Sequence, residues 1–248
     1  MRLAELYEAQ LGRPEAACEA LRAVTDVEPE HRGALEGLSR LYERRGQWQE
    51  LVEVLQRRAD SAANDAERVT LTHQLGNIME RELDNELNAI AVYGQVLRLD
   101  AKYEPSVQAL LRITKLADYR EDAAAIVEPH LRTQERWDDL ATLLQLRADV
   151  MTDPHQKAEQ LVALADVHEQ GRRNPGAALD ALLLSIGERA NDDGILDRAE
   201  SLAGPLGRWP ELVEVLFSEA GASLNPARGA ELYQRAARIC EEELEDRT

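Results

Sequence analysis

The chain has 248 residues, with a hydrophobic fraction of 44%, an aromatic fraction of 4% and a formal net charge of −18. This balance is typical of a folded protein, and the excess of acidic residues argues against nucleic acid or an anionic membrane surface as a partner. Ala, Leu, Glu and Arg dominate and runs of strand-forming residues are absent, so we predict an all-α fold.

The first predicted helices include the sequence LAELYEAQLGRPEAACEAL at 3–21. The phrase returns as LGNIMERELDNELNAIAVY at 75–93 and as LADVHEQGRRNPGAALDAL at 164–182, and AARICEEELED at 236–246 begins a fourth copy. The starts of these copies are 72, 89 and 72 residues apart. Self-similarity at a fixed period predicts a repeat protein.

A second phrase, GQWQELVEVL at 46–55, returns as GRWPELVEVL at 207–216 and more loosely as ERWDDLATLL at 135–144. Its tryptophans keep the same rhythm, and a tyrosine stands at the equivalent position in the middle of the chain. We interpret these aromatic residues as structural spacers at the turn between two helices, each packing against the following unit. They are Trp48, Tyr119, Trp137 and Trp209.

The interval of 89 residues contains an insertion, for which we predict an extra helix near 119–134. Pro129 lacks an N–H group and is expected to kink or break this helix. Apolar residues at helical spacing, such as Leu38, Leu41 and Tyr42, predict four helices in each block and about fourteen in the chain. We predict one domain over 1–248, with blocks 1–72, 73–161, 162–233 and the start of a fourth at 234–248.

Neither end of the sequence has the polar outer face that usually closes a repeat array. We therefore expect either a piece of a longer array or ends that pair with another copy of the chain.

The hairpin LSRLYERRGQWQELVEVL resembles the tetratricopeptide repeat (TPR). The resemblance covers essentially the whole chain and implies an open right-handed α-solenoid of antiparallel helical hairpins. It departs from the family in hairpins of about 35 and 37 residues and in Leu51, Leu140 or Leu212, which stand where the family has a small residue. The matching residues are Leu38, Ser39, Tyr42, Gly46, Trp48, Leu51 and Leu55, with Pro29, Leu75, Gly76, Ala89 and Tyr93.

The same resemblance implies a binding groove, because the first helix of each TPR hairpin lines a concave face. Asn77 matches the place where some TPR proteins hold the terminal carboxylate of a peptide. The Lys and Arg residues of such a clamp are absent, since Glu36, His73, Val162 and Gln234 occupy the matching position, so the sequence argues against a chaperone-tail clamp. The implied partner-binding residues are Glu36, Arg40, Glu43, Thr70, His73, Gln74, Asn77 and Arg81.

The sequence contains no pattern that indicates catalysis, a cofactor or a metal. The five histidines lack the HExxH spacing, neither Cys18 nor Cys240 has a partner at ligand spacing, and no glycine-rich phosphate loop is present. The acidic pairs after Trp137 and Asn191 are expected at helix starts and turns. Cys18 and His168 share repeat positions with apolar residues, so we expect packing roles for them. We predict a protein that is not an enzyme and has no cofactor.

These observations favour a non-enzymatic scaffold that binds a protein or peptide, including a basic one, along the concave face. The alternative is a structural module that self-assembles through its end repeats. An enzyme built as a closed α/α barrel would need a ring of converging acids that the repeats do not offer. A peptide-sensing role stays open, with the insertion as a hinge. Since no signal peptide or membrane span is found, we expect a cytoplasmic protein without membrane insertion.

Overall fold

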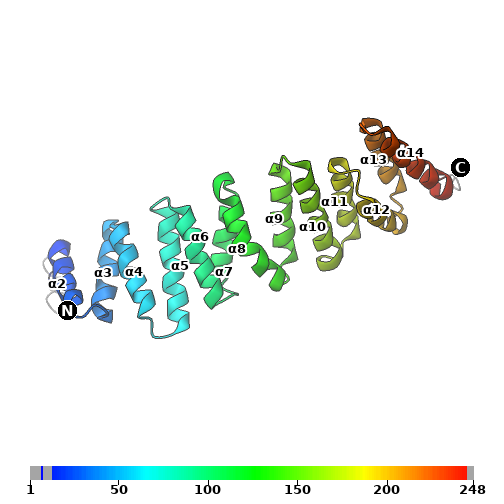
Figure 1. Cartoon of the computed structure of the whole chain (residues 1–248). Helices are drawn as coiled ribbons and strands as arrows, with labels where there is room; N and C mark the ends of the chain where they lie inside the picture. The colour runs from blue at the N-terminus through cyan, green and yellow to red at the C-terminus, as the bar shows by residue number, and fades with distance from the viewer. Residues whose placement is uncertain (1–6, 8–12, 245–248) are drawn as a thin grey trace. The chain divides into compact units, whose positions relative to one another are not determined.

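The computed structural model describes Tyr7 and residues 13–244, which form helices joined by turns (Figure 1). These described residues contain thirteen α-helices and no β-strand, and successive helices pack antiparallel. The predicted all-α fold is confirmed. None of the helices in this part of the chain combines the length and the apolar character needed to cross a bilayer.

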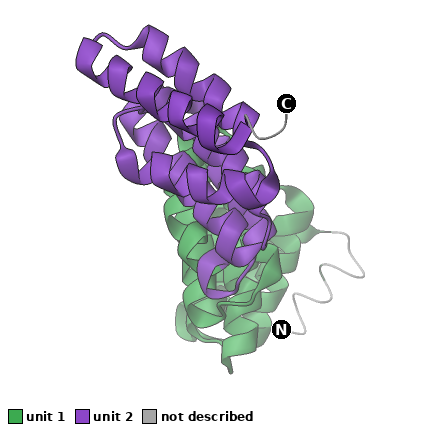
Figure 2. Cartoon of the chain, turned by 90° about the vertical axis from the view of Figure 1, so that its right-hand side faces the viewer, with its two compact units in different colours: residues 1–130 green, residues 131–248 purple. Residues whose placement is uncertain are grey.

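The chain divides into two compact units, residues 1–130 and 131–248, which Figure 2 shows in different colours. The helices of unit 1 are α2 (Pro14–Val27), α3 (Arg32–Arg45), α4 (Trp48–Asp60), α5 (Asp65–Arg81), α6 (Glu86–Leu99) and α7 (Glu104–Ile113). A short 3-10 turn, Ala117–Tyr119, leads into α8 (Arg120–Thr133), whose last residues belong to unit 2.

Unit 2 continues the alternation of helices, with two segments of π-helix at Val167–Gly171 and Cys240–Leu244. Each π segment directly follows an α-helix and extends it. The α-helices of unit 2 are α9 (Trp137–Val150), α10 (Pro154–Asp166), α11 (Pro175–Glu188), α12 (Asp193–Leu206), α13 (Trp209–Ala222) and α14 (Pro226–Ile239).

The turns form where the sequence supplies capping residues. Gly46 and Gly207 end α3 and α12 in the left-handed conformation, with φ of 64° and 65°, which costs glycine little because it has no Cβ. Asn64 and Asn174 begin α5 and α11 by accepting hydrogen bonds from backbone N–H groups of the first turn. The His31 ring also caps a helix, because its Nδ1 accepts from the Ala34 N–H at 3.2 Å.

The helices of the two units have the same register. The starts of α10, α11 and α12 lie 89 residues after those of α5, α6 and α7, and α11 and α6 also end at equivalent residues. Likewise, α13 and α14 begin 72 residues after α9 and α10. The intervals predicted from the sequence are therefore the intervals between equivalent helices.

Helix α8 occupies the inserted segment and does not break at Pro129. The expected break is therefore absent, and the reason is packing. Proline removes the bond that residue 129 would donate to the carbonyl of residue 125, but Ala123, Ala124 and Val127 are fully buried. Burial of this apolar face holds the helix together over the lost hydrogen bond.

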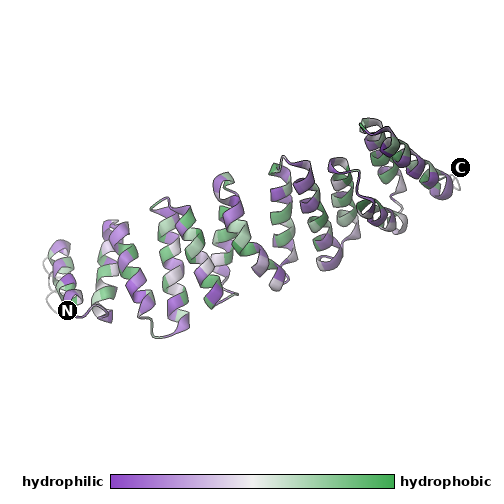
Figure 3. Ribbon diagram, viewed as in Figure 1, coloured by the Kyte–Doolittle hydropathy of each residue, from purple (hydrophilic) through white to green (hydrophobic). Residues whose placement is uncertain are grey.

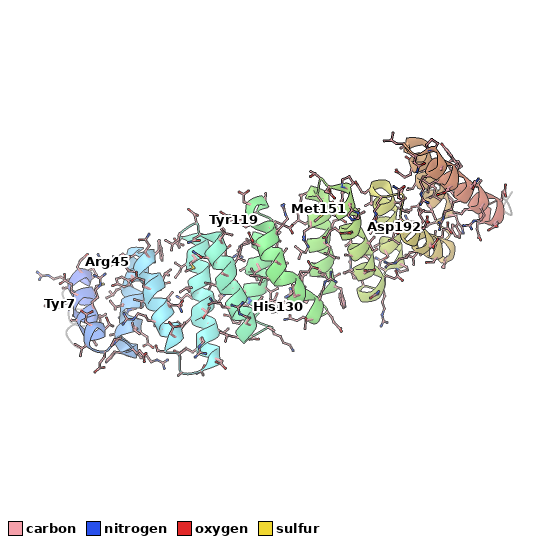
Figure 4. All side chains as sticks on the ribbon, viewed as in Figure 1. Tyr7, Arg45, Tyr119, His130, Met151 and Asp192 are labelled. Carbon is pink, nitrogen blue, oxygen red and sulfur yellow. The ribbon has the colours of Figure 1, made fainter. Side chains whose placement is uncertain are left out.

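Apolar residues form a stripe along each helix, visible as alternating green and purple segments in Figure 3. In unit 1, Leu35, Leu38, Leu55 and Leu75 are almost entirely buried in one core. The aromatic spacers lie at the turns, and Tyr119 can be found at the start of α8 in Figure 4. Trp137 packs so closely on Gly171 that a Cβ there would lie 2.4 Å from its ring.

Candidate partner-binding face

The first helices of the hairpins in unit 1, α3, α5 and α7, are joined by side-chain bonds. Arg32 Nη2 of α3 donates to Glu67 Oε1 of α5 at 2.7 Å. Arg112 of α7 donates two hydrogen bonds to Glu80 of α5, from Nε at 2.9 Å and from Nη2 at 2.7 Å. These contacts place the three helices side by side, and we call their shared exposed surface the first-helix face of unit 1.

The predicted binding residues lie on this face, but their exposure differs. On α3, Glu36, Arg40 and Glu43 are all exposed, and Glu36 accepts a hydrogen bond from Arg32 Nε at 3.0 Å. On α5, Thr70 and Arg81 are exposed, whereas the other three predicted residues of this helix are half-buried. These are His73, Gln74 and Asn77.

Asn77 carries a buried hydrogen-bond acceptor, its Oδ1 atom, that has no donor among the described residues. A buried acceptor without a donor costs about 1–3 kcal/mol, and such atoms are rare in folded proteins. The Asn77 amide would therefore gain from a donor, and one from another molecule can reach it only if the half-buried side chain turns outward.

His73 lies one turn before Asn77, between two tyrosine rings. Its ring centroid is 5.4 Å from that of Tyr93 and 5.3 Å from that of Tyr103, which it meets edge-on. His73 Nδ1 shares a hydrogen bond of 3.0 Å with Ser106 Oγ at the start of α7. Burial lowers the pKa of His73 by disfavouring the charged ring. The ring is therefore held in the face as a neutral aromatic group.

Tyr93 connects this aromatic group to the ion pair. Its hydroxyl donates to Glu80 Oε2 at 2.7 Å, and burial raises the pKa of Tyr93 above its ordinary value. The ring is fully buried against Gly76, where a Cβ would lie 2.7 Å from Tyr93 Cε1. Gly76 is thus required for the tyrosine to occupy this position.

Sequence reasoning identified His73 but missed Tyr103 and Ser106, which contact its ring, and the pair of Glu80 and Arg112 that holds Tyr93. They were missed because each contact joins helices far apart in sequence. The available signal was the recurrence of an acid and an arginine about one hairpin apart, as in the Arg32–Glu67 and Glu80–Arg112 pairs.

The first helices of unit 2, α10, α12 and α14, are joined by a denser set of ion pairs. Arg198 of α12 contacts Asp166 at 2.6 Å and Glu169 at 2.8 Å. Arg228 of α14 contacts Asp193 of α12 at 2.8 Å. Arg235 of α14 bridges to Asp197 and Glu200 of α12. Much of the acidic charge on these helices is therefore neutralised within the unit.

The acidic pairs considered in the sequence have structural partners. Asp138 contacts Arg172 at 2.8 Å, and Asp139 contacts Arg136 at 2.6 Å. Asp192, labelled in Figure 4, caps α12 by accepting from the Gly194 N–H at 3.0 Å. Over the part of the chain that the structure describes, no group of three or more His, Cys, Asp or Glu side chains is placed to hold a metal ion.

The two residues for which packing roles were predicted, Cys18 and His168, differ in how deeply they are buried. Cys18 is buried in the core of unit 1, as predicted. His168 is half-buried beside a cleft in unit 2, with Arg172 Nη1 at 3.2 Å from its Nδ1. Burial and the neighbouring Arg172 lower the pKa of His168. This histidine is therefore only partly packed.

Comparison with known proteins gives one family match. The model of the tetratricopeptide repeat family matches residues 34–69, which cover most of α3, all of α4 and the start of α5. None of the curated proteins compared with the chain matches it.

Two solved structures are similar to the chain at low levels. One is the structure of Naa15/Naa10 bound to HypK-THB, with a TM-score of 0.35 and 13% identity, over 98% of this chain and 39% of that chain. The chain thus spans well under half of that protein. The other is the complex of the TPR2AB domain of yeast Sti1 with pHSP90, with a TM-score of 0.33 and 13% identity, over 95% of this chain and 96% of that chain.

Proposed function

We propose, from the match of residues 34–69 to the tetratricopeptide repeat family, that the chain is a non-enzymatic scaffold that binds a protein or peptide on the first-helix face of unit 1. Repeat proteins of this kind use the surface formed by equivalent helices for recognition. We also propose, as the sequence predicted, that the blocks over 1–248 belong to one domain.

The buried oxygen of Asn77 is the observation that carries this proposal. When the half-buried Asn77 side chain turns outward, a backbone N–H of a bound chain can give Oδ1 the donor that it lacks and recover the cost of the unpaired acceptor. His73 supports the same site, because the stacked ring and its hydrogen bond to Ser106 fix the surface next to Asn77 before a partner arrives. A surface already held in one geometry loses less entropy on binding.

The charge of the chain favours a partner with basic residues. The formal net charge is −18, and Glu36 and Glu43 are exposed on α3. Complementary charge speeds encounter and disfavours acidic competitors. We therefore propose a peptide or protein segment that carries Lys or Arg.

The test combines four alanine substitutions on the face, at Arg40, His73, Asn77 and Arg81. The tagged chain is used to capture partners from cell extract, and helical content is followed by circular dichroism. We expect partners of the wild-type chain to be lost while the helical signal persists. The matched control places four alanines on exposed positions of the second helices, at Glu53, Gln56, Asn88 and Arg98. Capture that survives the first set and fails with the control set would contradict the proposed face.

Self-assembly is a second candidate, favoured by an exposed aromatic pair in unit 2. Phe217 of α13 and Tyr233 of α14 have ring centroids 5.7 Å apart, yet 45% and 43% of their surfaces are exposed. Leu224, between the two helices, is fully exposed. Light scattering over a concentration series tests this candidate: growth in mass that Phe217→Ser abolishes would support it, and a monomer at every concentration would remove it.

The proposed scaffold would work in the cytoplasm. Neither Cys18 nor Cys240 takes part in a disulfide, a state that a reducing compartment maintains. Fractionation of cells that produce the chain would test this location.

A further inference from the structure

The shared register of the two units pairs each residue of α5, α6 and α7 with one of α10, α11 and α12, 89 positions later. The four residues that fill the centre of the unit 1 face therefore have exact equivalents in unit 2. His73 corresponds to Val162, Tyr93 to Leu182, Tyr103 to Asp192 and Ser106 to Ile195.

These replacements exchange three rings and a hydroxyl for smaller or aliphatic groups. In unit 1 the His73 ring lies between the rings of Tyr93 and Tyr103, tilted to the first and edge-on to the second, and the three rings fill the space. In unit 2 the equivalent space is an open cleft of about 330 Å³, lined by Val162, Leu182 and Ile195 among others. The cleft therefore exists because the aromatic filling of the repeat is missing from this copy.

We propose that this cleft receives a large apolar side chain of a partner peptide, and that a Lys or Arg next to that side chain pairs with Glu159 on the rim. The inference rests on the proposed scaffold function and names a further point of contact in unit 2. Its volume is at the low end of the range for ligand sites, about 300–1,000 Å³. One Leu, Met or Phe side chain suits a cleft of this size better than a larger ligand.

The charges around the cleft indicate which residue of the partner peptide stands next to the inserted side chain. Arg198 on the rim is already paired with both Asp166 and Glu169. Arg189 faces Asp192 at 3.7 Å, so neither arginine is left to attract an acidic partner. Among the residues that the structure describes, Glu159 has its one ion-pair contact with His155, at 3.2 Å, and its side chain is 63% exposed. The rim carries two acids, Glu159 and Asp192, and two arginines, and Glu159 is the acid that pairs with neither arginine. A basic neighbour of the inserted side chain complements this carboxylate.

The test begins with a random dodecapeptide library displayed on phage and panned against the full chain. We expect the enriched peptides to share a Leu, Met or Phe beside a Lys or Arg. The strongest peptide is then synthesised and titrated by calorimetry against the wild type and variants. Val162→Phe fills the cleft and is expected to weaken binding about tenfold or more, the loss typical of a changed apolar pocket. Glu159→Lys is expected to weaken binding in the same direction.

Two controls separate filling of the cleft from damage to the fold. Val162→Ala keeps the cleft open and should retain binding. Val150→Phe adds the same ring at a 48% exposed position of unit 2 that does not line the cleft, and should leave binding unchanged. Circular dichroism confirms that each variant is folded.

The inference is overturned if no peptide is enriched, if the enriched peptides lack the apolar residue or carry acidic flanks, or if Val162→Phe binds as the wild type does. His73→Ala/Asn77→Ala separates this failure from failure of the proposed function. Peptides that need His73 and Asn77 but ignore Val162→Phe would leave the scaffold standing and remove only the cleft. Peptides whose binding depends on neither the unit 1 face nor the unit 2 cleft would contradict both the proposed function and the cleft.

Discussion

The layer of α5, α6 and α7 in unit 1 and the layer of α10, α11 and α12 in unit 2 start from one repeat and end with different surfaces. In unit 1, Gly76 leaves room for the Tyr93 ring, which is fully buried. In unit 2, the equivalent positions hold Ala165 and Leu182, both fully buried. A methyl group thus stands where the ring would pass, and a shorter side chain accompanies it. The comparison teaches that a Cβ atom at this position excludes the tyrosine ring, which is one of the replacements that separate a filled aromatic centre from an open cleft.

The ion pairs of the same two layers differ in another way. Glu80 and Glu169 are equivalent residues, and both accept from an arginine of the next first helix. The donors are not equivalent, because Arg198 stands about one turn earlier in its helix than Arg112 does. Arg198 therefore reaches the edge of the cleft, while Arg112 lies beyond the aromatic centre. The link between neighbouring helices is retained although its donor has moved.

The largest effect is expected from exchanging the centre of unit 1 for that of unit 2. Tyr93→Leu removes a buried ring and the hydrogen bond to Glu80, and is expected to lower the free energy of unfolding by about 2–4 kcal/mol. Gly76→Ala alone forces a methyl group against the ring and is expected to cost about 1–3 kcal/mol. The double variant copies Ala165 and Leu182, so it should cost clearly less than the two changes added together. Urea denaturation followed by circular dichroism measures all three.

Simple additivity of the two substitutions would contradict this account, because it would mean that the methyl group and the ring do not compete for space. Ala165→Gly in unit 2 is the matched control. Leu182 has no ring to accommodate there, so this change should bring the loss expected for glycine in a helix, about 1 kcal/mol, and that of one buried methyl group, about 0.8 kcal/mol.

A smaller effect is expected from the two arginines, and it should differ between the units. The Glu80 side chain is only 11% exposed, so Arg112→Met leaves a largely buried carboxylate without its charge partner. We expect a loss of about 1–3 kcal/mol. The partners of Arg198, Asp166 and Glu169, are 46% and 39% exposed, and Arg198→Met should cost about 0–1 kcal/mol. Equal losses in urea denaturation would show that burial of the carboxylate does not set the strength of the link.

Much of the fold was predictable because helical hairpins are local structures. The repeat intervals came from short phrases, and the turns at Gly46, Asn174 and Gly207 follow from the conformations that these residues favour. The continuity of α8 through Pro129 was not predictable from the residue alone. It depends on the burial of Ala123 and Val127, which tertiary packing supplies.

The candidate site was predictable only in outline. The register placed His73 and Asn77 on one face of α5, but it did not reveal that His73 is stacked and hydrogen-bonded to Ser106. That contact crosses from α5 to α7, and its geometry depends on the room that Gly76 gives Tyr93. The cleft of unit 2 was not predicted because no sequence motif marks an empty space between side chains. It becomes visible only when Val162 is compared with His73 in the same position of the repeat.

The smallest effect is a pH dependence that should belong to unit 1 and have no equivalent at Val162. Burial lowers the pKa of His73 below its ordinary value of 6.5; Glu80 opposes the shift, while Arg112 and Arg81 add to it. The unfolded chain therefore binds a proton more readily at this residue than the folded chain does.

The stability that neutral His73 contributes is complete above the ordinary histidine pKa and is lost as pH falls through and below it. His73→Gln does not titrate, so the difference in unfolding free energy between wild type and variant should shift in favour of the variant between pH about 7.5 and about 5. Burial also lowers the pKa of His130 and His168, but both residues are present in the two proteins and cancel in the difference. Urea denaturation at the two pH values gives this difference. A shift in favour of the wild type on acidification would mean that His73 gains its proton more easily in the folded chain, and the stacked neutral ring would then be the wrong description of the unit 1 face.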